Sequence, residues 1–210
     1  MAIAPEKADF KVISPISIFG PVELFVLMYH YDSLIEVCET YQKRSVRNRT
    51  RILSANGPLL LTVPLEKGKT KTAIKEVRIS YAENWIKDYL EGLRSAYANA
   101  PYFDYYFPDL EIIIKEKTIF LFDLFESSMS LLKKWIPLKP MAYTSSFQKE
   151  YRHSADLRVR KPDTYVKLRS YTQVFSEKFP FTGMLSILDL LFNLGPESTV
   201  ILADSKFNNF

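Results

Sequence analysis

The chain has 210 residues, of which 47% are hydrophobic and 14% aromatic, and a formal net charge of +4. This composition provides ample material for a packed core, and the 6 glycines are too few for fibrous or low-complexity classes. The single cysteine excludes a disulfide framework, so we expect a cytoplasmic protein. Residues 1–10 are mixed in polarity and no apolar run reaches the length of a membrane span, so we expect neither a signal peptide nor a membrane-spanning segment.

A strand–helix–strand unit is predicted near the start of the chain. Residues 10–13 are apolar and typical of a short strand, and 14–21 must form a loop because two prolines and a glycine interrupt it. Pro21 suits the first turn of a helix, and 22–31 follows as a helix that is apolar on most sides. Residues 34–38 predict a buried strand. Two strands joined by one helix over so short a stretch favour a parallel sheet.

A hairpin is predicted over 46–65. Its first arm alternates cationic with uncharged residues, which in a strand places three guanidinium groups on one face, those of Arg47, Arg49 and Arg51. A helix would scatter these three groups. An Asn-Gly-Pro turn signal at 56–58 separates this arm from an apolar second arm.

The second half of the chain is predicted to be mainly helical. Ser80 and Glu83 have the spacing of a capping box before a helix that ends near Tyr97. Pro108 is expected to begin a further helix, and 118–135 is a long amphipathic helix. The remaining expected elements are short strands at 74–79, 141–147 and 199–203, an irregular segment over 148–183, and a helix over 185–194 that ends at Gly195-Pro196.

These elements predict an α/β fold class. We expect an N-terminal βαβ layer with a mixed sheet, followed by a mainly helical C-terminal half packed against it. We expect one domain over 1–210, with its α/β part at about 10–80 and its helical part at about 81–210. The sequence contains no internal repeat and no convincing linker.

The most informative stretch is 42–51, which holds five of the chain's 28 Lys and Arg residues and no acid. The remaining 23 face 24 Asp and Glu, so the rest of the chain is nearly neutral. Crowded like charges are unfavourable unless an anion compensates them, and the planar guanidinium of Arg suits phosphate or carboxylate groups. Two interpretations stay open: a site for a phosphorylated or acidic small molecule, or cations paired with acids elsewhere in the chain. A nucleic-acid partner is less favoured, because such binding usually brings a more basic overall balance.

Other chemistry has less support from the residue types present. His30, His153 and Cys38 do not provide the ligand spacing of a zinc site, so we expect no transition metal. A Mg²⁺ cofactor stays open, because one or two carboxylates and a phosphate suffice to bind it. The glycine-rich dinucleotide motif, the phosphate-binding loop and the nucleophile elbow are absent. Asp189 and Asn193 lie one turn apart on an apolar helix, which indicates either a buried structural network or a pocket lining.

Several blocks of sequence occur in an order that is typical of one family. They are Lys43-Arg44-Ser45, Asn48-Arg49, Gly57-Pro58-Leu59, Leu61-Thr62-Val63-Pro64, Trp85, the run AYANAPYF at 96–103 and the run LSILDLLFNLGPE at 185–197. With these blocks the chain resembles the WbqC-like family, bacterial proteins often met in surface-polysaccharide (O-antigen) gene clusters. The spacing is similar to that of the branch found in Bacteroidetes.

The resemblance implies a role in surface-polysaccharide or modified-sugar biosynthesis, and glycyl or other acyl transfer to an amino sugar has been suggested for some members. The opening of the chain also resembles that of nucleotidyl-transferring enzymes such as pantothenate synthetase, in which a histidine on the first loop stabilises phosphate charge. Many WbqC-like proteins carry His-Gln-Pro at the end of the first strand. This chain has Ile13-Ser14-Pro15 there, a departure that argues against phosphate chemistry dependent on such a histidine.

On this basis we expect a group-transfer enzyme that binds an anionic, phosphorylated or nucleotide-linked small molecule. The expected substrate-binding residues are Lys43, Arg44, Asn48, Arg49 and Asn193. Asp189 is nominated as the general base. The alternative is a non-catalytic binding or scaffolding protein of the same pathway, which the missing histidine and the abundance of aromatic residues favour.

Overall fold

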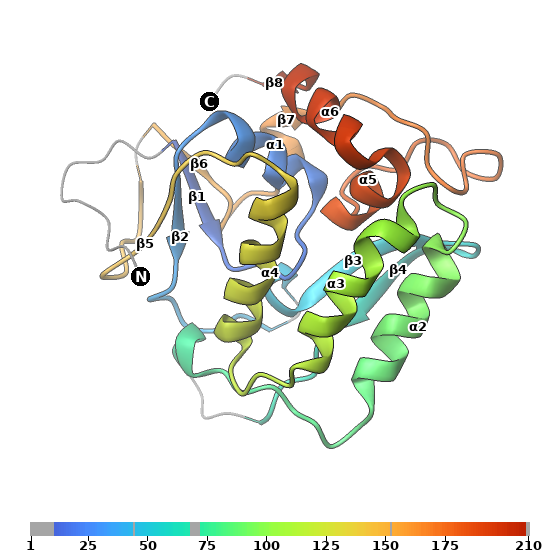
Figure 1. Cartoon of the computed structure of the whole chain (residues 1–210). Helices are drawn as coiled ribbons and strands as arrows, with labels where there is room; N and C mark the ends of the chain where they lie inside the picture. The colour runs from blue at the N-terminus through green and yellow to red at the C-terminus, as the bar shows by residue number, and fades with distance from the viewer. Residues whose placement is uncertain (1–10, 44, 68–71, 152, 209–210) are drawn as a thin grey trace.

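The predicted strand–helix–strand unit is present at the start of the chain (Figure 1). It consists of β1 (Val12–Pro15), α1 (Val22–His30) and β2 (Ser33–Glu36), and the two strands pair in parallel. Helix α1 is buried over Val22 to Met28, as its apolar sequence predicts. The computed structural model describes residues 11–43, 45–67, 72–151 and 153–208.

The second half of the chain adds two strands to this sheet. β5 (Met141–Tyr143) pairs with β2, and β6 (Ala155–Asp156) pairs with β1, both in parallel. The strand order is therefore β5-β2-β1-β6. One face of the sheet joins the main core, and the other carries a small separate cluster formed by Ile13, Leu34 and Ala142 with Tyr151 packed against it. Both faces of the parallel sheet are thus covered, as such sheets require.

The predicted hairpin forms a separate two-stranded sheet. β3 (Arg49–Ser54) and β4 (Gly57–Thr62) pair antiparallel, with Arg51 opposite Leu60. The strands expected to make one mixed sheet are therefore divided between a parallel sheet and this hairpin. A short 3₁₀ turn, η1 (Val46–Asn48), precedes β3, so Arg47 does not lie on the strand.

Three amphipathic helices stand side by side in the middle of the chain, α2 (Trp85–Tyr97), α3 (Phe103–Lys115) and α4 (Leu121–Trp135) (Figure 1). Helices α2 and α4 match the sequence predictions closely. Helix α2 packs on the hairpin, and Phe122 of α4 contacts Tyr143 of the parallel sheet. The remaining elements are η2 (Ile74–Glu76), η3 (Pro162–Thr164), β7 (Val166–Lys167), α5 (Ile187–Leu194), η4 (Gly195–Glu197), α6 (Ser198–Asp204) and β8 (Lys206–Phe207).

Four local predictions were wrong, and packing explains the first. Pro108 lies inside α3 instead of beginning it, because one apolar face continues across the proline from Phe103 to Ile114. The predicted capping box is absent, since Ser80 Oγ accepts from the N–H of Ala82 and α2 begins only at Trp85.

The other two errors concern short strands. Within 74–79, Ile74–Glu76 form η2 and only Arg78 and Ile79 make isolated β-bridges, and 199–203 lies within α6. The β-branched residues of α6 are overridden by tertiary contacts: Ile201 and Leu202 are buried, and the Ser198 hydroxyl bonds the carbonyl of Leu190.

The carboxyl edge of the parallel sheet is held by a buried charge network. The Glu36 carboxylate, at the end of β2, is fully buried and accepts from Arg158 Nη1 at 2.9 Å and from the Thr144 hydroxyl at 2.8 Å. Arg158 also donates to Asp156 at the end of β6, with an Nη2–Oδ2 distance of 2.6 Å. One guanidinium group therefore ties together the ends of two strands on either side of β1.

Replacement of Arg158 by Met should lower the free energy of unfolding by about 3–5 kcal/mol, because it leaves two carboxylates without their cation. Arg169→Met removes a pairing with Asp204 in which both side chains are half exposed, and should cost less than about 1 kcal/mol. Urea titration of both variants measures the difference. Equal losses of unfolding free energy in the two variants would show that the Arg158 network does not stabilise the sheet.

Candidate functional site

Two adjoining cavities open beside the carboxyl edge of the parallel sheet. Their volumes are about 240 and 480 Å³, within the range of small-molecule sites when taken together. They share five lining residues, Pro21, Ser45, Val46, Lys161 and Met184, and we call them together the groove.

The position of the groove follows from the strand order. The chain leaves β1 through α1 to reach β2 on one side, whereas β6 lies on the other side of β1. Pro15, at the end of β1, and the segment from Leu157 to Lys161, which follows β6, line the first cavity. In open parallel sheets a crevice forms at such a reversal of strand order, and ligands bind there.

The loop between β1 and α1 forms a rigid wall of the groove. Its carbonyls at Ile18 and Phe19 accept from the hydroxyls of Thr50 and Ser186, at 2.8 and 2.7 Å. Phe19 has φ 44° and Met184 has φ 56°, left-handed conformations that are uncommon for residues other than glycine. Both residues line the groove, and such strain tends to gather at functional sites.

Three cations give the second cavity its charge. Arg49 and Arg51 project from the same face of β3, and Lys161 comes from the segment after β6. Within the described parts of the chain none of the three forms an ion pair, and Asp163 is the one acid in the lining. Cations outnumber acids there, so the cavity favours an anion.

The hydrogen bonds of the two arginines leave donors unused. Arg51 Nη1 donates to the carbonyl of Gly183 at 3.3 Å, and Arg49 Nε is buried without an acceptor among the described residues. A buried charged donor without a partner is costly, and this one belongs to a residue that lines the second cavity.

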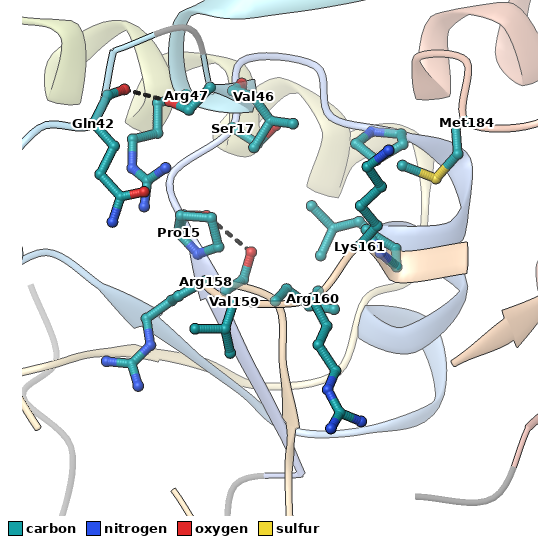
Figure 2. Close-up of a pocket in the computed structure, with 16 residues that line it drawn as sticks. Pro15, Ser17, Gln42, Val46, Arg47, Arg158, Val159, Arg160, Lys161 and Met184 are labelled. Atoms are coloured by element: carbon teal, nitrogen blue, oxygen red, sulfur yellow. Dashed lines mark hydrogen bonds between the residues drawn. The ribbon is translucent and has the colours of Figure 1, made fainter. Parts of the chain in front are cut away.

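The first cavity has a different character. Figure 2 shows Lys161 extending toward Met184, whereas the guanidinium groups of Arg158 and Arg160 point the opposite way. Arg47 also lines this cavity, but its guanidinium is held by the Glu39 carboxylate through two hydrogen bonds of 2.7 and 2.6 Å. Among the described lining residues, Arg160 also forms no ion pair, but its guanidinium points away from Lys161 (Figure 2), so the charge directed at the second cavity comes from Arg49, Arg51 and Lys161.

A buried carboxyl group lies behind the groove wall. Glu23, in the first turn of α1, accepts from the Met184 N–H at 2.7 Å through Oε1, and its Oε2 has no partner among the described residues. Burial raises the pKa of Glu23, and Asp163 adds to this effect, whereas the Met184 N–H and the Arg51 charge oppose it.

Residues 19–161 match the model of the WbqC-like protein family. The chain belongs to this family. In the comparisons with curated proteins and with solved structures, nothing matches this chain. The matched range of this WbqC-like chain includes Arg49, Arg51 and Lys161 and ends before Met184 and Asp189.

The site residues predicted near the basic segment are dispersed. Arg49 lines the groove, whereas Lys43 is exposed and belongs to neither cavity. Arg44 lies outside the described residues. Asn48 is buried, accepts from the Tyr41 hydroxyl at 3.1 Å and donates to the Val63 carbonyl at 2.8 Å, so its amide is occupied by the protein.

The two residues predicted on the last apolar helix lie away from the groove lining. Asp189 is fully buried and accepts from the hydroxyls of Tyr97 and Tyr171 and from Gln173 Nε2, at 2.9, 2.6 and 3.0 Å. Burial raises the pKa of Asp189 although these three donors lower it. Asn193 Nδ2 donates to the backbone carbonyl of Asp189 at 2.7 Å. The geometry is that of a connected buried network, and the catalytic role of Asp189 stays a prediction.

The sequence signal for the groove was incomplete. The alternation of the basic segment predicts Arg51 on the same strand face as Arg49, but nothing in the sequence singles Arg51 out as a site residue. Lys161 lies in a segment interpreted as irregular, and a strand of two residues, β6, positions it. Such a short strand leaves no pattern from which Lys161 could have been found.

Two further observations concern the described part of the chain alone. It contains no cluster of three or more His, Cys, Asp or Glu side chains that could hold a metal ion. None of its helices has the length and apolar character needed to cross a membrane.

Glu23→Gln should change how stability depends on pH. Burial raises the pKa of Glu23 in the folded protein, so the protonated form of this side chain favours folding. Its contribution to the free energy of unfolding is complete below about pH 4.5 and is lost as the pH rises through the folded pKa. The unfolding free energy of the variant, relative to wild type, should therefore rise from pH 4.5 to 8 in urea titrations. Asp189 shifts in the same direction but is present in both proteins, so the difference isolates Glu23. A flat or falling difference contradicts the assignment.

Proposed function

We propose that the groove binds an anionic small molecule, phosphorylated or nucleotide-linked, and that the protein is a group-transfer enzyme of surface-polysaccharide or modified-sugar biosynthesis. The observation that carries the proposal is the set of three cations, Arg49, Arg51 and Lys161, that line one cavity without an ion pair among the described residues. Guanidinium groups match the geometry of phosphate oxygens, which supports a phosphate in preference to a simple inorganic anion.

The placement of the cavity supports a small-molecule site. The first cavity of the groove lies at a reversal of strand order, and the adjoining second cavity lies beside the start of α1, where the backbone dipole also favours negative charge. The cations would aid a transfer reaction if they stabilise charge that grows on a phosphate or carbonyl oxygen in the transition state. The pathway part of the proposal rests on the resemblance to WbqC-like proteins of polysaccharide gene clusters.

A non-catalytic binding protein of the same pathway is the second candidate. Among the described residues the groove lining contains no histidine or cysteine, and its one carboxylate is the exposed Asp163. A site that binds without chemistry needs no general base. Ligand binding with no turnover of any donor–acceptor mixture favours this candidate, whereas product formation that requires Arg49 favours the enzyme.

A panel of nucleotides, sugar nucleotides, coenzyme A esters and sugar phosphates, scored by thermal shift at millimolar concentration, tests the proposal. A ligand that binds only the folded state raises the unfolding midpoint. Absence of any shift across the panel, with the protein shown to be folded by circular dichroism, would contradict anion binding in the groove.

Arg49→Gln should weaken the binding of the best panel ligand about 10- to 100-fold, corresponding to the loss of about 1.5–3 kcal/mol from hydrogen bonds to a charged group. Its stability should change little, because the Nε donor has no acceptor to lose. Isothermal titration calorimetry provides the affinities. Arg169→Gln, distant in sequence and paired with Asp204, is the matched control and should bind as wild type.

Lys43→Gln, in the same titrations, separates the sequence prediction from the cavity. An effect as large as that of Arg49→Gln would place the ligand against the exposed loop of Lys43, outside the groove. An effect confined to Arg49→Gln supports the groove.

A further inference from the structure

The groove exposes aliphatic side chains next to its cations. Val46, Leu60 and Val159 line it, and they are 41, 50 and 78% exposed. Val46 lines both cavities, Leu60 the second and Val159 the first, so the apolar surface continues from one cavity into the other. Apolar side chains at such exposure inside a concave site indicate a ligand surface that covers them.

The register of the hairpin places one of these side chains beside the cations. Leu60 is directly opposite Arg51, so the two side chains lie on the same face of the hairpin. Leu59 is opposite Ile52 and lies on the other face, although it is also exposed, at 43%. An exposed leucine thus lies beside an arginine that forms no ion pair among the described residues, and the neighbouring Leu59 offers a matched control.

The lining favours an aliphatic group over a planar base. Phe19 is the one aromatic residue of the groove in the described chain, and its side chain is fully buried. Bases commonly stack on exposed aromatic faces, and none is presented here. The first cavity has both polar and apolar lining residues, and the prolines, valines, leucines and methionine among them suit a flexible aliphatic chain.

We infer that the ligand is amphiphilic, a phosphate monoester whose anionic group lies among Arg49, Arg51 and Lys161 and whose aliphatic chain runs along Leu60 and Val46 toward Val159. This inference rests on the proposed function of the same groove and names the class of ligand. Both a lipid-like phosphate and a phosphorylated carrier arm have this chemistry.

Methyl, butyl, hexyl and octyl phosphate, titrated below their micelle concentrations, test the inference. Methyl phosphate measures anion binding alone. The dissociation constant should fall about fourfold for each methylene buried in the groove, since burial of one methylene contributes about 0.8 kcal/mol. Geranyl phosphate and 4′-phosphopantetheine then distinguish a branched lipid-like chain from an amide-containing carrier arm, according to which binds more tightly than octyl phosphate.

Leu60→Ser and Val159→Ser should flatten the dependence on chain length and leave methyl phosphate binding unchanged. Leu59→Ser should retain the full dependence. Arg49→Gln should weaken every member of the series by the same factor, because it acts on the shared phosphate.

The outcomes separate the two proposals. Methyl phosphate binding without any gain from longer chains overturns the amphiphilic ligand and leaves the anion site intact. Tighter binding of adenosine monophosphate than of hexyl phosphate also overturns it, in favour of a planar base. No binding of any phosphate, by wild-type protein that is folded, overturns the anion site itself.

Discussion

The position of the groove depends on the buried ion pairs at the carboxyl edge of the parallel sheet. Glu36 ends β2 and Asp156 ends β6, and both carboxylates would repel each other across β1 without a cation between them. Arg158 supplies it, and its guanidinium also stacks near Tyr151, with 4.8 Å from Cζ to the ring centroid. The network fixes where β6 ends and hence where the next residues, up to Lys161, enter the groove.

Ion pairs with buried carboxylates explain why some cations near the groove are neutralised and others are not. Arg158 and Arg47 each hold buried carboxylates and neutralise them, so they contribute little field to the groove. Arg49 and Arg51 differ because they lie on β3, two residues apart, and line the second cavity. Clustered cations are tolerated there because Lys161 is exposed and Arg49 and Arg51 are partly exposed, so solvent screens their charges.

Elements with regular patterns could be predicted from the sequence, as could β5 within the strand expected at 141–147, whereas the strands of two residues could not. The strand–helix–strand unit, the hairpin and helices α2, α4 and α5 follow from apolar periodicity and turn residues. Strand β6 has two residues and no periodicity, yet it determines the strand order and the position of Lys161. The Glu36–Arg158 contact spans 122 residues of sequence, a separation at which local pattern carries no information.

The cations of the basic segment differ in whether the protein itself pairs them. Arg47 is paired with Glu39, as one of the two interpretations expects, whereas Arg49, two residues later, forms no ion pair within the described residues. The difference is set by backbone geometry, because η1 turns Arg47 inward before the alternation of β3 begins at Arg49. A high density of charge in a sequence therefore indicates a candidate binding region. The change from 3₁₀ turn to strand determines which of its arginines line the second cavity.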